Sequence, residues 1–368
     1  MSGRLKTAAS AGLAGVLCAV SIVLGASPAV SQPVNAPPTG GRTQVVLLGT
    51  AGGPPLRLHR SEPSNLLIVD GRLYLFDCGL GAVRQIMAAG LRPEAVNTVF
   101  ITHHHPDHDL DLVGLMGNTS FMADATASKP MRIFGPPGTV AMTKAAIDYL
   151  GVPFGQFAAE HLRAPWPPQG LFDATDLAKE GLVFQDDKIR VYAAENSHFS
   201  LMTPAERAGR YAYSYRVETP DAVVVFTGDT GPSAAVAKLA MGADVLVTEA
   251  IDVATMERNI RAQAAAGLIS PTFVANNLDN ILGHMRDEHL DLPEVAKLAN
   301  AAQVRSVIVT HMGPESDTNR DLGTYAARIQ SGFRGQIEQA VDLARFCVVP
   351  KTSGSQALKA CPIAAPSH

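Results

Sequence analysis

The chain has 368 residues, 46% of them hydrophobic, so it can bury a large core as one big domain or two small ones. Its formal net charge is −4. This charge excludes a general electrostatic affinity for nucleic acid, which needs an excess of lysine and arginine.

The N-terminal segment differs in kind from the rest. Arg4 and Lys6 precede an uncharged apolar run over residues 7–24, and small residues flank a cleavage site near Ser31. This pattern predicts a secretory signal peptide over residues 1–31 and therefore a periplasmic or secreted protein. The alternative is that the segment stays uncleaved as a membrane anchor. In that case the protein would contact the membrane only through this segment. Cleavage removes two basic and no acidic residues, which leaves 28 basic and 34 acidic residues and a net charge of −6.

The mature chain divides into three parts. Residues 32–42 are rich in proline and predict a linker, residues 43–346 a single hydrolase domain, and residues 347–368 a C-terminal tail. Cys347 and Cys361 are consistent with a disulfide in an oxidising compartment or with two free thiols, and the sequence leaves this open.

Apolar and β-branched runs alternate with helical patterns through the domain. The predicted strands are Thr43–Leu48, Leu66–Val69, Leu73–Phe76, Asn97–Thr102, Met131–Phe134, Val191–Ala194, Tyr211–Val217, Ala222–Thr227, Asp244–Val247 and Val304–Thr310. The predicted helices are Ala82–Ala89, Asp109–Met116, Gly138–Leu150, Ala234–Leu239 and Leu292–Ala302. Residues 151–189 read as loop, and residues 251–283 as irregular helix, a lid or arm over the site. The interleaving indicates a layered α/β domain with strands inside and helices outside.

The strongest motif is His103-His104-His105-Pro106-Asp107-His108, which directly follows the predicted strand Asn97–Thr102. Residues i and i+2 of extended chain point to the same side, so His103 and His105 can converge on one ion while His104 faces away. Pro106 then turns the chain and offers Asp107 and His108 to a second ion. Imidazole and carboxylate ligands suit zinc, with manganese or iron as alternatives.

Three more ligands follow strand ends in the same way. His198, Asp229 and His311 each come within a few residues of an apolar strand, and strand ends of a sheet hold side chains accurately. The predicted set is His103, His105 and His198 for one ion, Asp107, His108 and His311 for the other, and Asp229 bridging both. Seven ligands for two ions leave positions for water, which is typical of a catalytic site.

With these residues in place, the sequence resembles the metallo-β-lactamase superfamily. The matching segments are T-H-H-H-P-D-H at 102–108, His198, F-T-G-D-T at 226–230 and T-H at 310–311. L-G-T-A-G-G-P-P at 48–55, F-D-C-G at 76–79 and H-L-D-L-P-E-V-A at 289–296 are similar to ribonuclease Z and to secreted arylsulfatase-like and phosphodiesterase-like hydrolases. The resemblance implies an αββα four-layer sandwich with the dinuclear centre at one edge, between the two sheets.

The resemblance also implies catalytic roles. Asp107 corresponds to a metal-binding aspartate that serves as general base, and His289 to a histidine that assists the leaving group. His284 is an alternative for the second role. Asp77 and Glu249, at predicted strand ends, are interpreted as carboxylates that orient the imidazoles.

We therefore predict an exported dinuclear-metal hydrolase in which a metal-bridging hydroxide attacks a phosphodiester or sulfate ester. The expected partner is a small anionic ester, and a nucleic acid partner is not expected of an acidic chain. The alternatives are a carboxylic ester, lactone or lactam hydrolase, a tRNA 3′-processing-type endonuclease, and a non-enzymatic metal-binding scaffold. A homodimer is compatible with the sequence, which does not determine the oligomeric state.

Overall fold

The structure, a computed structural model, describes residues 42–122, 129–160, 170–314, 323–351 and 356–361. The predicted signal peptide, residues 1–31, and most of the predicted linker lie outside these ranges. Within them, no helix combines the length and the apolar character needed to cross a membrane.

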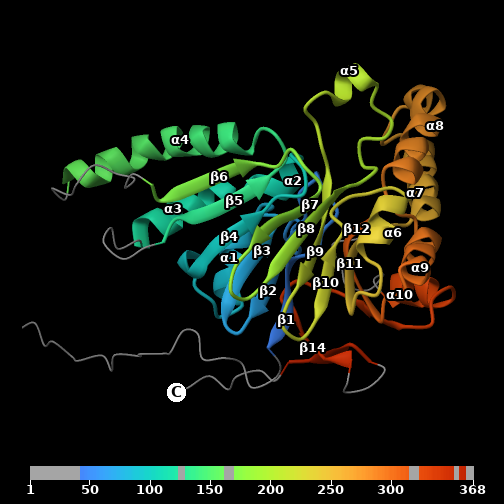
Figure 1. Ribbon diagram of the computed structural model, residues 1–368. Helices are drawn as coiled ribbons and strands as arrows, with labels where there is room; N and C mark the ends of the chain where they lie inside the picture. Colours follow the sequence, from blue (N-terminus) through green and yellow to red (C-terminus); the bar gives the residue numbers. More distant parts are fainter. Residues whose placement is uncertain (1–41, 123–128, 161–169, 315–322, 352–355, 362–368) are drawn as a thin grey trace, which may run out of the picture. The chain divides into compact units, whose positions relative to one another are not determined.

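The described strands form two mixed sheets that face each other (Figure 1). In spatial order, the first sheet contains β15 (Leu358–Ala360), β14 (Ala344–Val348), β1 (Thr43–Gly49), β2 (Ser64–Val69), β3 (Arg72–Phe76), β4 (Val96–Phe100), β5 (Met131–Gly135) and β6 (Phe172–Asp176). The second contains β13 (Gln336–Gln339), β12 (Ser306–Gly313), β11 (Val245–Ile251), β10 (Val223–Phe226), β9 (Tyr213–Glu218), β8 (Arg190–Glu195) and β7 (Gly181–Gln185).

Helices cover the outer face of each sheet. The first sheet packs against α1 (Ala82–Ala88), α3 (Leu112–Met122) and α4 (Thr139–Glu160). The second packs against α6 (Ala234–Leu239), α9 (Leu292–Ala301) and α10 (Gly323–Gln330). Three short helices, η1 (Pro93–Ala95), α2 (Pro106–Asp109) and α5 (Pro204–Arg207), lie in connections, and α7 (Val253–Ala265) packs on α8 (Pro271–Asp287). The order of layers is helix, sheet, sheet, helix, which confirms the predicted αββα sandwich.

The central strands are buried on both faces, which explains why they read as continuous apolar runs. In β1, Val45 and Leu47 point into the core between the sheets, while Val46 and Leu48 point into the core under the helices. The inter-sheet core is strongly aromatic, and the ring of Phe76 stacks on that of Phe226 from the other sheet at a centroid distance of 4.2 Å. This packing fixes the separation of the two sheets.

The structure differs from the sequence-based reading in three places. Residues 151–189 are not all loop, because α4 continues to Glu160 and strands β6 and β7 follow. These strands lie at sheet edges and are largely exposed, so their apolar residues are too few, as in β6, or form too short a run, as in β7, to read as a buried strand. The irregular helix over 251–283 is two helices, α7 and α8. The predicted boundary at residue 346 falls inside β14, and β15 also belongs to the first sheet.

Cys347 and Cys361 form a disulfide that joins β14 to the residue after β15. The two cysteines are 14 positions apart, and closing a loop of that size removes conformational entropy from the unfolded chain. We expect that replacing both by alanine lowers the free energy of unfolding by about 3 kcal/mol, measured by urea denaturation with the reduced wild type as control. An unchanged unfolding midpoint after reduction would contradict this stabilising role.

Candidate metal centre

The candidate site lies where several strands end. Strands β3 to β6 are parallel to one another, as are β10 to β13, so their carboxyl ends meet at common sheet edges. At this edge the two sheets are tied together by hydrogen bonds: the Tyr213 amide donates to the Thr102 carbonyl at 2.9 Å, and the Tyr215 hydroxyl to the Ile101 carbonyl at 2.7 Å. The histidine-rich segment that begins at His103 is therefore held between both sheets.

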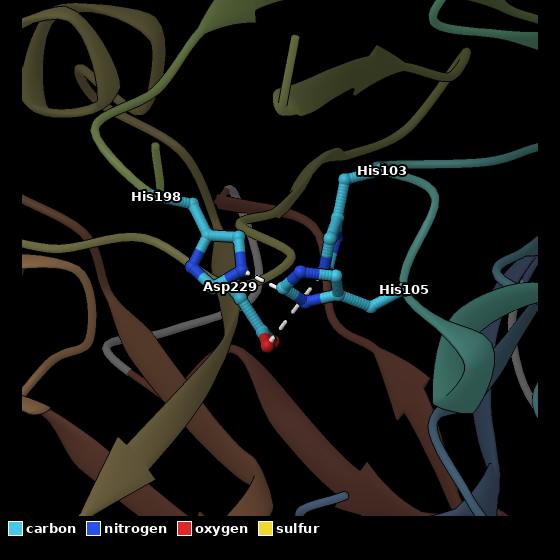
Figure 2. A group of neighbouring side chains, drawn as sticks. All are labelled: His103, His105, His198 and Asp229. Atoms are coloured by element: carbon cyan, nitrogen blue, oxygen red, sulfur yellow. Dashed lines mark hydrogen bonds and ion pairs between the residues drawn. The ribbon is translucent and has the colours of Figure 1, made fainter. Parts of the chain in front are cut away.

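The first group of potential ligands consists of His103, His105, His198 and Asp229, whose side chains converge in Figure 2. One ligand atom from each lies within 4.8 Å of the others. The His198 Nε2 is 3.2 Å from the His105 Nδ1, and the His103 Nε2 is 3.9 Å from an Asp229 carboxylate oxygen. Three imidazoles and a carboxylate thus face a common point.

The second group consists of Asp107, His108 and His311. Asp229 connects it to the first group, because its Oδ1 lies 3.4 Å from the His108 Nε2 and 3.3 Å from the His311 Nε2. The Asp107 Oδ2 lies 3.4 Å from the same His311 nitrogen. The structure therefore brings all seven predicted ligands into two adjoining groups that share Asp229.

Several of these atoms are buried without a hydrogen-bond partner in the described part of the chain. They are the Nε2 atoms of His103, His108 and His311 and the Oδ1 of Asp229. A buried polar atom without a partner costs free energy, so a cluster of them facing one another needs a binding partner. Imidazole nitrogen and carboxylate oxygen are donors that divalent zinc accepts, and the residues fit a pair of such ions.

The far side of three imidazoles is hydrogen-bonded. The His108 Nδ1 lies 2.9 Å from Asp77 Oδ2, the His103 Nδ1 lies 3.1 Å from the Thr102 hydroxyl, and the His198 Nδ1 donates to the Glu288 carbonyl at 3.0 Å. Such contacts fix the ring orientation and leave the other nitrogen for an ion. Asp77 was predicted in this role, whereas Glu288 acts through its backbone, which no side-chain pattern reveals.

The backbone around the cluster is unusually constrained. His311 and Asp77 adopt positive φ angles of 41° and 60°, a region that non-glycine residues rarely enter. At Gly53 a Cβ would lie 2.1 Å from Asp107 Oδ2, so only glycine lets this loop approach the carboxylate. The surrounding structure therefore maintains local strain at the ligands.

Burial and opposite charges set the electrostatics of the cluster. Burial lowers the pKa of His198 to about 3, which keeps its imidazole neutral. Burial alone would also lower the pKa of His311, but the Asp229 and Asp107 carboxylates raise it to about 9. Burial would raise the pKa of Asp229, but the neighbouring imidazoles of His311 and His108 hold it well below its usual value. The carboxylates thus attract positive charge to the centre.

The structure separates the two histidines considered for the leaving group. His289 is buried beside the centre, with its Nδ1 2.7 Å from a Glu249 oxygen and 4.0 Å from an Asp229 oxygen. Glu249 is itself fixed, because its other oxygen accepts the Thr230 amide at 2.6 Å. His284 is more exposed and pairs with the Glu288 carboxylate at 2.6 Å. Of the two, His289 is the one grouped with Asp229.

The contact between Asp77 and His108 gives a testable prediction. In Asp77→Asn the charged acceptor that orients His108 is lost, so we expect metal affinity to fall by about 10- to 100-fold with the fold retained. Competition with a chelator measures the affinity, and Asp148→Asn, at an exposed carboxylate of α4, is the matched control. Equal affinity in Asp77→Asn and wild type would show that this carboxylate does not support the ligand.

Residues 72–312 match the family described as the beta-lactamase superfamily domain. The chain belongs to the beta-lactamase superfamily. Membership shows that it is a metal-dependent hydrolase and implies bound divalent metal ions.

Ribonuclease Z proteins are similar to this chain over nearly their whole length. Ribonuclease Z of Mycobacterium sp. (strain KMS) is 31% identical over 311 residues, which cover 83% of this chain and 96% of that protein. Ribonuclease Z of Mycobacterium bovis (strain BCG / Pasteur 1173P2) is 29% identical over 315 residues, which cover 84% of this chain and 99% of that protein. These relatives confirm the predicted resemblance to ribonuclease Z.

Solved structures of the superfamily share the fold at low sequence identity. YhfI from Bacillus subtilis, a metallo-beta-lactamase fold protein, superposes with a TM-score of 0.55 at 14% identity, covering 82% of this chain and 98% of that one. The short form of human tRNase Z gives a TM-score of 0.52 at 18% identity with the same coverage. These likenesses confirm the sandwich architecture.

Proposed function

We propose that the protein is a phosphodiesterase that uses two divalent metal ions, with zinc the favoured metal and manganese or iron as alternatives. The observation that carries this proposal is the arrangement of seven potential ligands in two groups joined by Asp229. His103, His105 and His198 would hold one ion, Asp107, His108 and His311 the other, and Asp229 both. When bound, such ions acidify water and supply positive charge to an anionic ester.

The protein's own residues would handle the protons. The Asp107 carboxylate, beside His311, would accept a proton from the attacking water. The His289 Nε2 would donate a proton to the departing ester oxygen, while Glu249 holds the ring through Nδ1. Gly53 leaves space for Asp107 to face the centre.

Two observations support a phosphodiester substrate. The cluster offers cation positions that suit an anionic ester better than a neutral lactone or lactam, although those neutral substrates can use the same ions. The relatives with 29–31% identity are named ribonuclease Z, and ribonucleases act on phosphodiester bonds. A sulfate ester shares the charge and tetrahedral shape of the substrate but has no support from these relatives.

RNA cleavage of the tRNA 3′-processing type is the second candidate, favoured by the 31% identity over 96% of a ribonuclease Z. Against a nucleic acid substrate, the chain is acidic, and two cations of the segment 150–190 are engaged elsewhere. Lys188 lies 3.1 Å from an Asp70 oxygen, and Arg190 lies 2.8 Å from a Glu218 oxygen. We therefore favour a small anionic diester.

We also propose that the protein is exported to the periplasm or secreted. The signal-peptide pattern of residues 1–31 supports export, and so does the disulfide, because disulfides persist in oxidising compartments. Fractionation of cells producing the full chain tests this proposal. Protein found in the cytoplasm with residues 1–31 still attached would contradict it.

A substrate panel tests the activity. Purified protein is assayed with bis(p-nitrophenyl) phosphate, p-nitrophenyl sulfate, a lactone, nitrocefin and an RNA with a 3′ trailer, each with and without a chelator. We expect chelator-sensitive turnover of the phosphodiester and much slower turnover of the others. Fastest turnover of the RNA would favour the second candidate, and fastest turnover of the sulfate, lactone or nitrocefin would overturn the phosphodiester assignment.

A further inference from the structure

A cavity of about 200 Å³ adjoins the metal centre on the side of His105. We name it the Phe199 pocket, and its walls include the following residues: His104, His105, Phe199, Met202, Arg210 and Tyr211. The volume is below the roughly 300–1,000 Å³ of sites for drug-sized ligands. The pocket is therefore suited to one compact group attached to whatever reacts at the centre.

Aromatic side chains dominate the wall next to the ligands. The Phe199 ring lies 5.5 Å from that of His105 and 4.9 Å from that of His198, measured between centroids. On another side, the Tyr211 ring stacks on Tyr213 at 6.0 Å, which holds it in place. Ordered aromatic walls favour a flat ring, because stacking tolerates many ring types without specific hydrogen bonds.

A cation stands at the rim of this pocket. Arg210 is exposed and donates a hydrogen bond to the Glu206 carbonyl, but among the described residues it forms no ion pair with a carboxylate. The Glu206 carboxylate is near enough to interact electrostatically with Arg210, but it accepts its hydrogen bonds from Thr203, at 2.9 Å from the Thr203 amide and 2.8 Å from the Thr203 hydroxyl. The preceding arginine, Arg207 at the end of α5, is neutralised by Glu195. Arg210 therefore keeps its charge available beside a centre that must receive an anionic ester.

We infer that the Phe199 pocket binds a flat ring, a nucleobase or an aryl group, on the ester group that stays attached to phosphorus, with Arg210 attracting the phosphate. This inference rests on the proposed phosphodiesterase function. In that reaction the bond from phosphorus to the departing oxygen breaks, a bond to the water oxygen forms, and one water proton passes to the departing alcohol. His289, which would protonate the departing oxygen, does not line the pocket, so the pocket is assigned to the retained group.

Three diesters with one common leaving group test the inference. Bis(p-nitrophenyl) phosphate retains an aryl group, thymidine 5′-(p-nitrophenyl phosphate) retains a nucleoside, and methyl p-nitrophenyl phosphate retains no ring. All three release p-nitrophenolate, which matches the assay, and the thymidine and methyl diesters both retain an alkyl ester, which also matches their chemical step. We expect kcat/KM for at least one ring-bearing diester to exceed that of the methyl ester by roughly 5- to 150-fold, the range one stacked ring supplies. Whichever ring-bearing diester has the higher kcat/KM shows whether the pocket prefers the ring of a nucleotide or that of an aryl ester.

Two variants separate the two parts of the pocket. In Tyr211→Ala, kcat/KM for the ring-bearing diesters divided by kcat/KM for the methyl diester should fall towards one. In Arg210→Ala, KM should rise for all three diesters. The control is Arg261→Ala, because Arg261 is an exposed arginine of α7 that pairs with Glu257. This variant should keep the wild-type ratio of kcat/KM values. Melting temperatures identify any variant that fails to fold.

A binding measurement keeps this inference distinct from the proposed function. Calorimetry of the metal-loaded protein with thymidine 5′-phosphate, p-nitrophenyl phosphate and methyl phosphate should give tighter binding of a ring-bearing compound. Equal affinities, or equal kcat/KM for the three diesters, would overturn the inference and leave the phosphodiesterase assignment intact. Ring-dependent binding without hydrolysis of any diester would support the pocket and overturn the proposed function.

Discussion

Asp229→Ala is expected to lose at least about 10³-fold in kcat/KM and to retain less than two metal ions per chain. The reason is geometric, since this one carboxylate lies within 4 Å of the Nε2 atoms of His103, His108 and His311. Removing it deprives both ligand groups of their shared member. Phosphodiester turnover and elemental analysis on the same preparation measure the two losses.

The matched control for this variant is Asp148→Ala. Asp148 is an exposed carboxylate of α4 that pairs with Lys144, far from any potential ligand in sequence. It should keep wild-type turnover and metal content. If Asp229→Ala retained a tenth of the activity with two bound ions, the bridging role assigned to this carboxylate would be wrong.

His289→Ala is expected to lose about 10²- to 10⁴-fold in turnover of a diester whose leaving group is an alkoxide, the range for a general acid. A poor leaving group needs a proton as its bond to phosphorus breaks, and the buried His289 ring, held by Glu249, is placed to supply it. With p-nitrophenyl esters the loss should be much smaller, because p-nitrophenolate departs as an anion. Thymidylyl-thymidine and bis(p-nitrophenyl) phosphate provide this comparison.

The matched control is His284→Ala, which removes the other histidine near the same end of α8. His284 pairs with Glu288 and is partly exposed, so its loss should affect both substrates alike and only mildly. Metal content should be unchanged in both variants. A larger, leaving-group-dependent loss in His284→Ala than in His289→Ala would assign the proton donor to His284.

The ligands could be predicted from the sequence because four are contiguous with one strand end. Residues 103–108 follow the mostly buried strand β4, His198 and Asp229 follow β8 and β10, and His311 lies near the end of the fully buried strand β12. Strands buried on both faces leave a clear apolar pattern, and the polar residues after them stand out. The same logic predicted the layered fold, whose central strands all belong to this class.

The parts that the sequence did not predict have little or no local pattern. Strands β6 and β7 are largely exposed at sheet edges; β6 has few apolar residues, and the apolar run of β7 is only three residues long. Strand β15 is held by pairing with β14 and by the disulfide at Cys361, both long-range contacts of a short segment. The Glu288 carbonyl orients His198 from 90 positions away, and the Phe199 pocket combines distant segments.

The most direct test of the central claim is elemental analysis of the purified, unchelated protein, followed step by step with activity during metal removal and restoration. The protein should carry two divalent ions per chain, lose phosphodiester turnover as they are removed, and recover it when zinc or manganese returns. Full turnover by protein that carries less than one ion per chain would contradict it.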